Sequence, residues 1–295
     1  MKDKKVLYLG GGSMLGVFGA GIVTTLQKED SYQHIDTIYG ASAGAFNAAY
    51  FLSHQAKMGS TIYWEDLTHN FIDQKGVLKK TTQRILNRLF PRLDVPDENN
   101  PLNIDHLIEV IQTNKKLDVE EINEGSIDFY VKVLDTETGE IKFLDAKEDI
   151  IQRLRETISA LPYYYSKEQR YIDGDVLSPL GLESIIENHP DQKIVIGINH
   201  NPSNIGGQKR RILNKLDGIL TSKLYPNLDL YRRFSEKEDH YIKQLNIAER
   251  EGRILLISPT SQLPSSQSTT NPTKLIETYN QGKKAGKKIA RFLRE

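Results

Sequence analysis

The sequence predicts an α/β fold, because a strand, a glycine-rich turn and a helix follow one another twice near its start. Residues 6–9 form a continuous apolar run that leads into glycines at positions 10–12, and a helix is expected over residues 17–27. A second strand is expected over residues 35–39, followed by a turn over residues 40–44 and by apolar residues at helical spacing. Both turns are therefore candidate sites of chemistry.

The second turn has the sequence Gly40-Ala41-Ser42-Ala43-Gly44 and places a serine between a strand and a helix. This arrangement is typical of the nucleophile elbow of acyl-transfer enzymes, in which small neighbours allow a sharp turn. The start of the following helix also favours developing negative charge. Ser42 is therefore the candidate nucleophile, and a surface serine in a glycine-rich turn is the alternative.

The first turn has two interpretations. Gly10, Gly12 and Gly16 fit a loosened dinucleotide-binding fingerprint, which requires an acidic residue at the end of the next strand. Asp36 instead lies near the start of that strand. Glycines also let backbone N–H groups point at a forming oxyanion without obstruction from side chains. We therefore favour an oxyanion hole over a nucleotide site.

The composition excludes several classes of protein. The 295 residues contain 39 Lys plus Arg and 39 Asp plus Glu, so no global field attracts nucleic acid. There is no cysteine, which excludes disulfides, thiol catalysis and thiolate metal sites. No apolar run has the length of a signal peptide or a membrane span, and no spacing of acidic residues or histidines suggests a metal site or another cofactor. A cytoplasmic protein is expected.

The segment over residues 59–128 is expected to be an inserted helical cap, since it has few strand-like runs and contains Pro91, Pro96 and Pro101. Two basic clusters predict transient contact with a membrane surface, although a solvated helix and a favourable helix dipole explain the same residues. The first cluster, in the cap, comprises Lys75, Lys79, Lys80, Arg84, Arg88 and Arg92. The second, near the C-terminus, comprises Lys283, Lys284, Lys287, Lys288, Arg291 and Arg294.

The rest of the chain continues the α/β pattern, and residues 1–295 are read as one domain. A hairpin is expected from strands over residues 128–134 and 141–144, and a helix over residues 147–159 stops before Pro162. Further strands are expected over residues 193–199 and 253–257, with a polar helical layer over residues 213–250 between them. A last helix begins at Pro272, with Asn271 as its cap.

The residue that would activate Ser42 is left open by local patterns. A serine nucleophile needs a base within hydrogen-bond reach. None of the seven histidines lies in a motif that marks it as this base. The dipeptide Asp173-Gly174 by itself indicates only a turn.

Four motifs in this order resemble those of the patatin-like phospholipase family, and the likeness runs through most of the chain. The glycine turn over residues 9–16 resembles that family's oxyanion loop, and residues 40–44 resemble its serine elbow. Residues 157–162 resemble its Ser-Ala-x-Pro segment, and Asp173-Gly174 resembles its Asp-Gly dyad motif. Residues 257–282 also resemble the tail of bacterial members.

This resemblance implies a three-layer α/β/α fold with a central, mostly parallel sheet and a Ser-Asp dyad in place of a triad with histidine. Ser42 would be the nucleophile and Asp173 the general base. The resemblance further assigns the oxyanion hole to Gly10, Gly11 and Gly12, and gives Gly40, Gly44 and Gly174 to the elbow and dyad motifs. No cofactor and no metal ion are implied.

Two positions depart from the family pattern. Ser13-Met14-Leu15 stands where the family usually carries Arg or Lys, which puts a phospholipid preference in doubt. Asp175 stands where the family often has glycine and adds a charge beside the dyad. The expected function is hydrolysis of lipid carboxylic esters, as by a phospholipase A or a lysophospholipase. The alternatives are a silent lipid-binding or regulatory protein, an acyltransferase and a nucleotide-dependent oxidoreductase.

Overall fold

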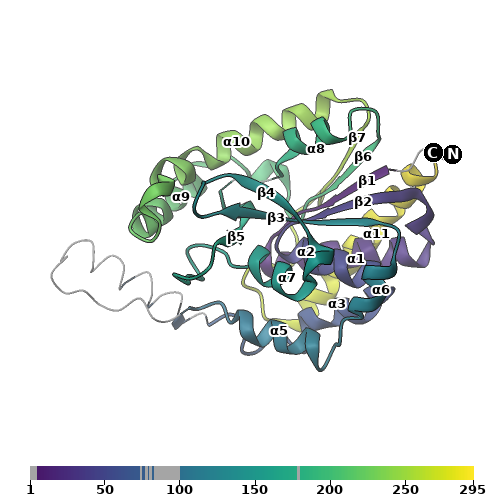
Figure 1. Cartoon of the computed structure of the whole chain (residues 1–295), viewed down its shortest axis with the longest axis horizontal. Coiled ribbons are helices and arrows are strands. Elements are labelled where there is room, and N and C mark those ends of the chain that lie inside the picture. The colour runs from purple at the N-terminus through teal and green to yellow at the C-terminus, as the bar shows by residue number, and fades with distance from the viewer. Residues whose placement is uncertain (1–4, 74, 77–78, 80–81, 83–99, 178–179) are drawn as a thin grey trace.

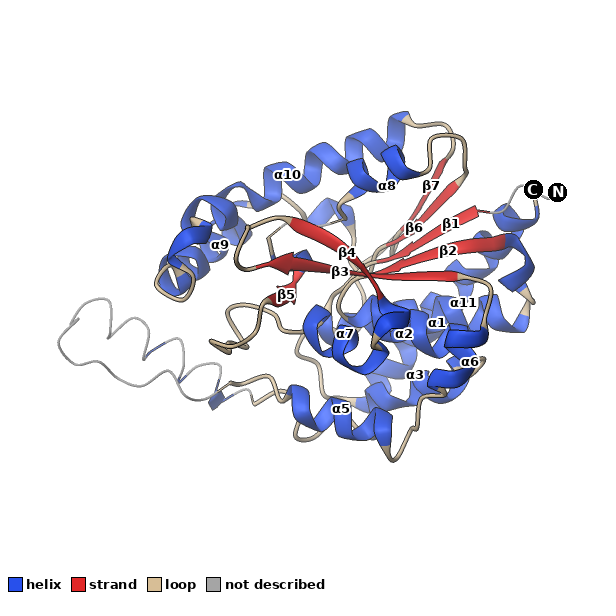
Figure 2. Ribbon diagram, in the orientation of Figure 1, coloured by secondary structure: helices blue, strands red, loops and turns tan. Residues whose placement is uncertain are grey.

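The computed structural model describes residues 5–73, 75, 76, 79, 82, 100–177 and 180–295, and its strands form one sheet with helices on both faces (Figures 1 and 2). The strands are β1 (Lys5–Leu9), β2 (Ile35–Gly40), β3 (Asp128–Asp135), β4 (Ile141–Asp145), β5 (Tyr171–Asp173), β6 (Ile194–Gly197) and β7 (Ile254–Ile257). The α-helices are α1 (Gly16–Lys28), α2 (Ala43–Leu52), α3 (Ala56–Glu65), α5 (Ile104–Gln112), α6 (Val119–Glu124), α7 (Ile150–Thr157), α8 (Leu182–Asn188), α9 (Gln208–Thr221), α10 (Leu230–Arg250) and α11 (Pro272–Arg294).

The sheet is mostly parallel, as predicted. Its strand order is β4-β3-β2-β1-β6-β7, and β5 pairs with β3. Strands β3, β2, β1, β6 and β7 pair in parallel, whereas β4 and β5 run antiparallel to β3. The expected hairpin is therefore confirmed as β3 and β4, and the three-layer α/β/α arrangement is confirmed as well.

Alternating side chains of β1 feed two separate cores. Leu7 and Leu9 pack in the larger core, together with residues of α1, α2 and α11. Val6 and Tyr8 point to the opposite face and pack with residues of α8 and α10. Figure 2 shows α8 and α10 on one side of the sheet and α1, α2, α3 and α11 on the other. The period of two along a strand thus fixes which helices cover each face.

Two expected helices differ in their bounds. The helix expected over residues 147–159 begins at Ile150, because the Asp149 side chain accepts the Gln152 N–H and caps α7. The helical layer expected over residues 213–250 is two helices, α9 and α10, separated by a short 3-10 turn that begins at Pro226. Proline at this turn lacks the N–H that a continuous helix would need.

The described part of the segment expected to be a cap packs as part of the main domain. Helices α3, α5 and α6 contribute Ile62, Ile108 and Ile122 to the same core as α1 and α2. Of the first basic cluster, Lys75 and Lys79 are described and exposed, and its other members lie outside the described residues. A separate cap stays a prediction that concerns this stretch.

Strands β2 and β5 follow one another along the same edge of β3. β2 pairs with residues 128–131, ending at the pair Gly40 and Val131, and β5 pairs with residues 133–135, beginning at the pair Val133 and Asp173. β4 pairs with residues 130–134 and so occupies the other edge. Lys132 lies in the gap between the two pairings. This geometry brings the residues that follow β2 beside the end of β5.

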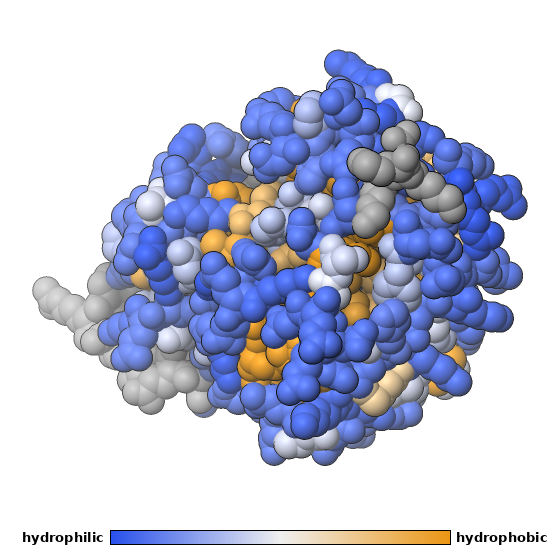
Figure 3. Space-filling view, turned by 45° about the vertical axis from the view of Figure 1, so that its right-hand side comes forward, coloured by the Kyte–Doolittle hydropathy of each residue, from blue (hydrophilic) through white to orange (hydrophobic). Residues whose placement is uncertain are grey.

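The surface offers no broad apolar face in the view of Figure 3. Hydrophilic side chains predominate there, and apolar residues gather in recesses between them. No helix within the described ranges has the length and apolar character needed to cross a bilayer.

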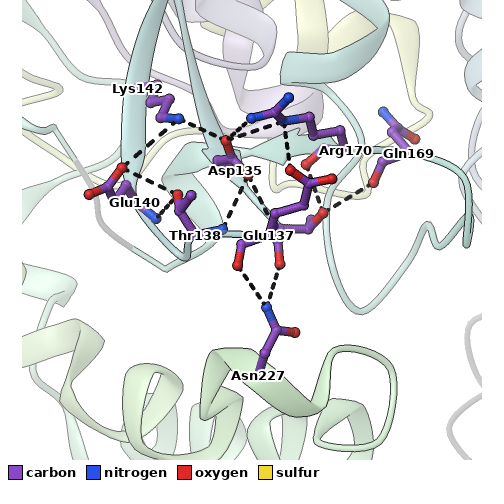
Figure 4. Close-up of polar contacts among 9 residues, drawn as sticks. Asp135, Glu137, Thr138, Glu140, Lys142, Gln169, Arg170 and Asn227 are labelled. Atoms are coloured by element: carbon purple, nitrogen blue, oxygen red, sulfur yellow. Dashed lines mark hydrogen bonds and ion pairs between the residues drawn. The ribbon is translucent and has the colours of Figure 1, made fainter.

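Asp135, the last residue of β3, fastens the β3–β4 turn and the segment that leads into β5 (Figure 4). Its carboxylate accepts hydrogen bonds from Lys142 Nζ at 2.8 Å, from Arg170 Nη2 at 3.1 Å and from the Glu137 N–H at 2.9 Å. Burial alone would raise the pKa of Asp135, but the hydrogen bonds from Lys142, the Glu137 backbone and Arg170 outweigh it and lower the pKa to about 2. Asn227 donates to the carbonyl oxygens of Thr136 and Glu137, which ties the turn to the segment before α10.

Replacing Asp135 with asparagine should lower the free energy of unfolding by about 2 kcal/mol at pH 7, because hydrogen bonds to a buried charge are lost. The folded-state pKa lies below the unfolded value, so this contribution is present at neutral pH and is lost as the pH falls from about 4 through about 2. Urea denaturation of both proteins at pH 7 and pH 3 measures the difference. A difference of equal size at the two pH values would contradict this role for Asp135.

Candidate active site

Ser42 lies in the tight turn between β2 and α2, and its backbone is strained. Its φ is 50° and its ψ is −126°, a conformation that favours glycine over residues with a side chain. A Cβ atom at Gly40 would lie 2.5 Å from Ala45 Cα, and one at Gly44 would overlap the Leu9 carbonyl oxygen. Glycine at both positions therefore lets the turn close tightly against the end of β1.

Two hydrogen bonds in series hold the strained turn. The Ser42 N–H donates to Thr157 Oγ1 at 2.9 Å, and the Thr157 hydroxyl donates to the Lys132 carbonyl oxygen at 2.8 Å. Thr157 is fully buried at the end of α7. The gap between the β2 and β5 pairings on β3 thus supplies the acceptor that anchors Ser42.

Asp173 ends β5 and its side chain faces Ser42. The Ser42 side chain interacts favourably with the Asp173 carboxylate, and the two residues are 8% and 4% exposed. The Asp173 N–H donates to the Ser159 carbonyl oxygen at 3.2 Å, so residues 157–162 contact both members of the pair. Burial, reinforced by the nearby charge of Asp175, raises the pKa of Asp173 to about 7.

Gly174 is required by close packing. A Cβ atom at this position would lie 2.9 Å from Lys132 Cγ and 3.1 Å from the Val133 carbonyl carbon. A side chain would therefore push the end of β5 away from β3 and separate Asp173 from Ser42.

Asp175 is a second carboxylate at the site and accepts three hydrogen bonds. Its donors are Lys132 Nζ at 2.8 Å, Tyr8 Oη at 3.0 Å and the Gly11 N–H at 2.9 Å. Burial raises the pKa of Asp175, but the charge and hydrogen bond of Lys132, together with the other two donors, outweigh it, so that the pKa is lowered. Asp175 is therefore an anion at neutral pH.

The glycine loop lies directly against this pair of carboxylates. The Gly10 N–H donates to the Gly197 carbonyl oxygen at 2.8 Å, and the Gly11 N–H donates to Asp175. The Gly12 N–H has no acceptor among the described residues, and Gly12 itself is only partly buried. Of the three glycines assigned to the oxyanion hole, Gly12 alone thus has an N–H that is not already engaged within the described part of the chain.

Asn199 fixes the path of this loop. Its side-chain amide donates to the carbonyl oxygens of Gly10 at 2.6 Å and Gly11 at 3.1 Å, and its oxygen accepts the Gly19 N–H of α1 at 3.0 Å. Asn199 is buried just beyond β6. One side chain therefore links the loop to the helix that follows it.

The structure brings together Ser42, Asp173, the glycine loop and the elbow and dyad glycines that the sequence singled out. Lys132, Thr157 and Asn199 also support the site, and sequence reasoning assigned them no role. Thr157 lies within the segment that resembles a family motif, which is the one signal that could have marked it. Within the described ranges, His, Asp and Glu side chains form no cluster of three or more placed to hold a metal ion.

A family model described as patatin-like phospholipase matches residues 7–186 of the chain, which contain the glycine loop, Ser42 and Asp173. The chain belongs to the patatin-like phospholipase family. A second model, described as a domain of unknown function (DUF6363), matches residues 232–295. Asn199 lies between the two matches. The patatin-like match therefore includes Ser42 and Asp173 but not Asn199, which anchors the glycine loop.

Solved structures that align with this chain share little sequence with it. The crystal structure of VipD from Legionella pneumophila aligns with a TM-score of 0.51 and 12% identity over 98% of this chain and 67% of VipD. The structure of the type III effector protein ExoU aligns with a TM-score of 0.42 and 13% identity over 99% of this chain and 53% of ExoU. The chain thus spans about half the length of ExoU. No curated protein matches it by sequence.

The strain at Ser42 gives a stability prediction. Ser42→Gly should be more stable than Ser42→Ala by about 1 kcal/mol, since glycine adopts this backbone conformation without a Cβ penalty. Denaturant unfolding of the two variants measures the difference. The matched control is Ser53, which ends α2 with an ordinary φ of −84°, and there the alanine variant should be at least as stable as the glycine variant. If Ser42→Ala were at least as stable as Ser42→Gly, the backbone at Ser42 would not be strained.

Proposed function

We propose that this protein is a serine acyl hydrolase that cleaves carboxylic esters of lipids, with Ser42 as nucleophile and Asp173 as general base. The observation that carries the proposal is the position of Ser42, on a strained elbow, beside the buried carboxylate of Asp173, with which its side chain interacts. Membership of the patatin-like phospholipase family supports a lipid ester as the substrate class. That family match also includes the first glycine turn, which favours acyl transfer over dinucleotide binding there.

In the first half of the reaction, Ser42 Oγ attacks the ester carbonyl carbon while its proton moves to the Asp173 carboxylate. The tetrahedral intermediate collapses, the bond to the alcohol oxygen breaks, and Asp173 returns the proton to the leaving alcohol. Ser42 is left acylated. The raised proton affinity of Asp173 suits both steps, because a base with a pKa near the working pH can accept a proton and give it back.

In the second half, water attacks the acyl carbon and loses a proton to Asp173. The intermediate then collapses, the bond to Ser42 Oγ breaks, and the oxygen recovers the proton as the fatty acid leaves. An acceptor alcohol in place of water would give acyl transfer through the same residues. Acyltransferase activity is therefore the second candidate outcome of this chemistry.

The oxyanion donor in this proposal is the Gly12 N–H. The N–H groups of Gly10 and Gly11 already donate to Gly197 and Asp175. Of the three glycines expected to form the oxyanion hole, only Gly12 is therefore proposed as a donor. Gly12 directly precedes the short 3-10 turn at Ser13–Leu15. One oxyanion donor stabilises the transition state by about 3 kcal/mol.

The three residues in the place of the family cation differ in burial. Met14 is fully buried in the larger core, and its N–H donates to the Gln267 carbonyl oxygen at 3.3 Å, whereas Ser13 and Leu15 are partly buried. None of the three supplies a positive charge. The head group of the substrate must be recognised by other residues, and a preference for phospholipid stays a prediction.

The last members of the second basic cluster, Arg291 and Arg294 at the end of α11, are poorly placed to deliver lipid to Ser42. Lys5 Nζ, at the first residue of β1, donates to the Leu293 carbonyl oxygen at 2.8 Å, so the end of α11 lies at the amino end of β1. Ser42 lies beyond the carboxyl end, about 13 Å further along the strand. Transient membrane contact therefore stays a prediction. A membrane contact that delivers lipid to Ser42 would use a surface other than the end of α11.

A fluorophosphonate probe should label wild-type protein at Ser42 and leave Ser42→Ala unlabelled. Asp173→Asn should label about 100-fold or more slowly, because the base is lost. The wild-type rate should rise with pH through a midpoint near 7, since Asp173 must be ionised to accept the proton. In-gel fluorescence over time at pH 5 to 9 measures these rates.

The matched control for the serine variant is Ser53→Ala, another buried serine, which should label like wild type. Persistent labelling of Ser42→Ala, or a wild-type rate that does not change between pH 5 and pH 9, would contradict the dyad. Absence of wild-type labelling and of ester hydrolysis, with lipid vesicles present, would instead favour a silent lipid-binding protein.

A further inference from the structure

The ion pair of buried Lys132 with partly buried Asp175 has no role in the proton transfers described above. Lys132 Nζ and Asp175 Oδ1 are 2.8 Å apart, and the side chains are 0% and 20% exposed. Burying an ion pair requires both charges to be removed from water. Replacing such a pair with well-packed apolar residues of similar volume is often neutral or stabilising, so a buried ion pair is weak evidence for a role in stability. A functional reason for retaining it is therefore worth seeking in what it touches.

Asp175 touches both halves of the candidate active site. Its carboxylate accepts the Gly11 N–H of the glycine loop at 2.9 Å, and its own N–H donates to Asp173 Oδ1 at 2.8 Å. A Cβ atom built on Gly11 would lie 2.8 Å from Ser42 Cβ and 2.9 Å from Asp175 Oδ2. The Asp175 carboxylate thus lies beside the nucleophile, the base and the loop at once.

The two neighbouring carboxylates have opposite surroundings. Asp175 accepts hydrogen bonds from Lys132, Tyr8 and the Gly11 N–H, whereas Asp173 accepts one from a backbone N–H and interacts with the Ser42 side chain. Two such carboxylates separate into a permanent anion and a group that exchanges protons. Burial and the charge of Asp175 raise the pKa of Asp173, and this shift makes Asp173 the carboxylate that exchanges protons.

We propose that Asp175, held as an anion by Lys132, is a positioning residue that makes Asp173 a strong enough base for Ser42 and keeps the Gly11 loop in place. This inference rests on the proposed function of Ser42 and Asp173. In this arrangement the Gly11 N–H is a structural donor, and the Gly12 N–H serves the oxyanion. Asp175 acts through Asp173 and the loop without touching the reacting atoms.

Other ionisable groups also face these carboxylates and contribute to the electrostatic environment of Asp173 and Asp175. From α10, Lys237 and Tyr241 interact with Asp175, and Lys237 also interacts with Asp173. His200, which follows β6, faces Asp175 as well, and burial followed by the charge of Arg210 lowers its pKa to about 4, so it is neutral near pH 7. Tyr8, from β1, donates a hydrogen bond to Asp175 and interacts electrostatically with Asp173. Lys132 is the cation that hydrogen bonds directly to Asp175.

The pH dependence of Ser42 labelling by the fluorophosphonate probe in full-length Asp175→Asn tests the inference. Removing the anion should lower the midpoint by about one pH unit or more, because the ionised form of Asp173 is no longer opposed by a like charge. The plateau rate at high pH should also fall, since a weaker base accepts the serine proton less readily. A shift to lower pH together with a lower plateau is the expected signature.

The matched control is Asp135→Asn, which removes another buried, cation-bound carboxylate from the same β3–β5 unit but away from Ser42. Its midpoint should equal that of wild type. If Asp175→Asn does not fold, the double variant Lys132→Met/Asp175→Asn removes both charges and leaves no unpaired ion. Its midpoint should still fall, but by less, because Asp175 affects Asp173 more strongly than Lys132 does.

Three outcomes would overturn the inference. Faster labelling of Asp175→Asn at every pH, with an unchanged midpoint, would mean that Asp175 only obstructs the Gly11 donor. Slower labelling with an unchanged midpoint would mean a purely structural role. No labelling of wild-type Ser42 at any pH would remove the proposed function itself, and this result is distinguishable because it does not depend on Asp175.

Discussion

The candidate site depends on how one strand edge is shared. Strand β3 pairs with β2 as far as Val131 and with β5 from Val133 onward, so that the two segments meet at Lys132. Ser42 follows β2 and Asp173 ends β5, and their proximity is therefore set by backbone pairing rather than by loop conformation. The Lys132 carbonyl oxygen anchors the elbow through Thr157, and the Lys132 ammonium group binds Asp175. A single residue in the gap thus connects the Ser42 turn to Asp175.

The site stores unfavourable energy in two forms. Ser42 adopts a backbone conformation that its side chain disfavours, and Asp173 is a carboxyl group buried where its ionised form is penalised. Both are offset by the surrounding fold, through the extensive core on the α1, α2 and α11 face and the hydrogen bonds of Thr157 and Asn199. Such local costs are common where a nucleophile and a base are kept ready to react. Asp135 is also a buried carboxylate, but its surroundings favour the charged form. Lys142 and Arg170 donate hydrogen bonds to it, which stabilise its charge and hold the strands together.

Local sequence patterns predicted the parts of the structure that are formed by residues close together in the chain. The elbow, the strands before both turns and the β3–β4 hairpin depend on residues adjacent in the chain, and they were predicted. Lys132 was not, because it alternates with apolar Val131 and Val133 and a lysine in that pattern ordinarily faces water. Asn199 was missed for a similar reason: its contacts join residues about 190 positions apart, and a single asparagine after a strand carries no signal of them. The hydrogen bond from the Gly11 N–H to Asp175 likewise depends on a tertiary contact between the loop after β1 and the turn after β5, which no local motif encodes.

The central claim is that Ser42 carries an acyl group during turnover. It is tested most directly by quenching the protein in acid during hydrolysis of a p-nitrophenyl ester and measuring the mass of the peptide that contains Ser42. The account predicts an increase equal to the acyl group on that peptide, located at Ser42 by fragmentation. Ester turnover with no acylation of Ser42, or with the acyl group on another residue, would contradict it.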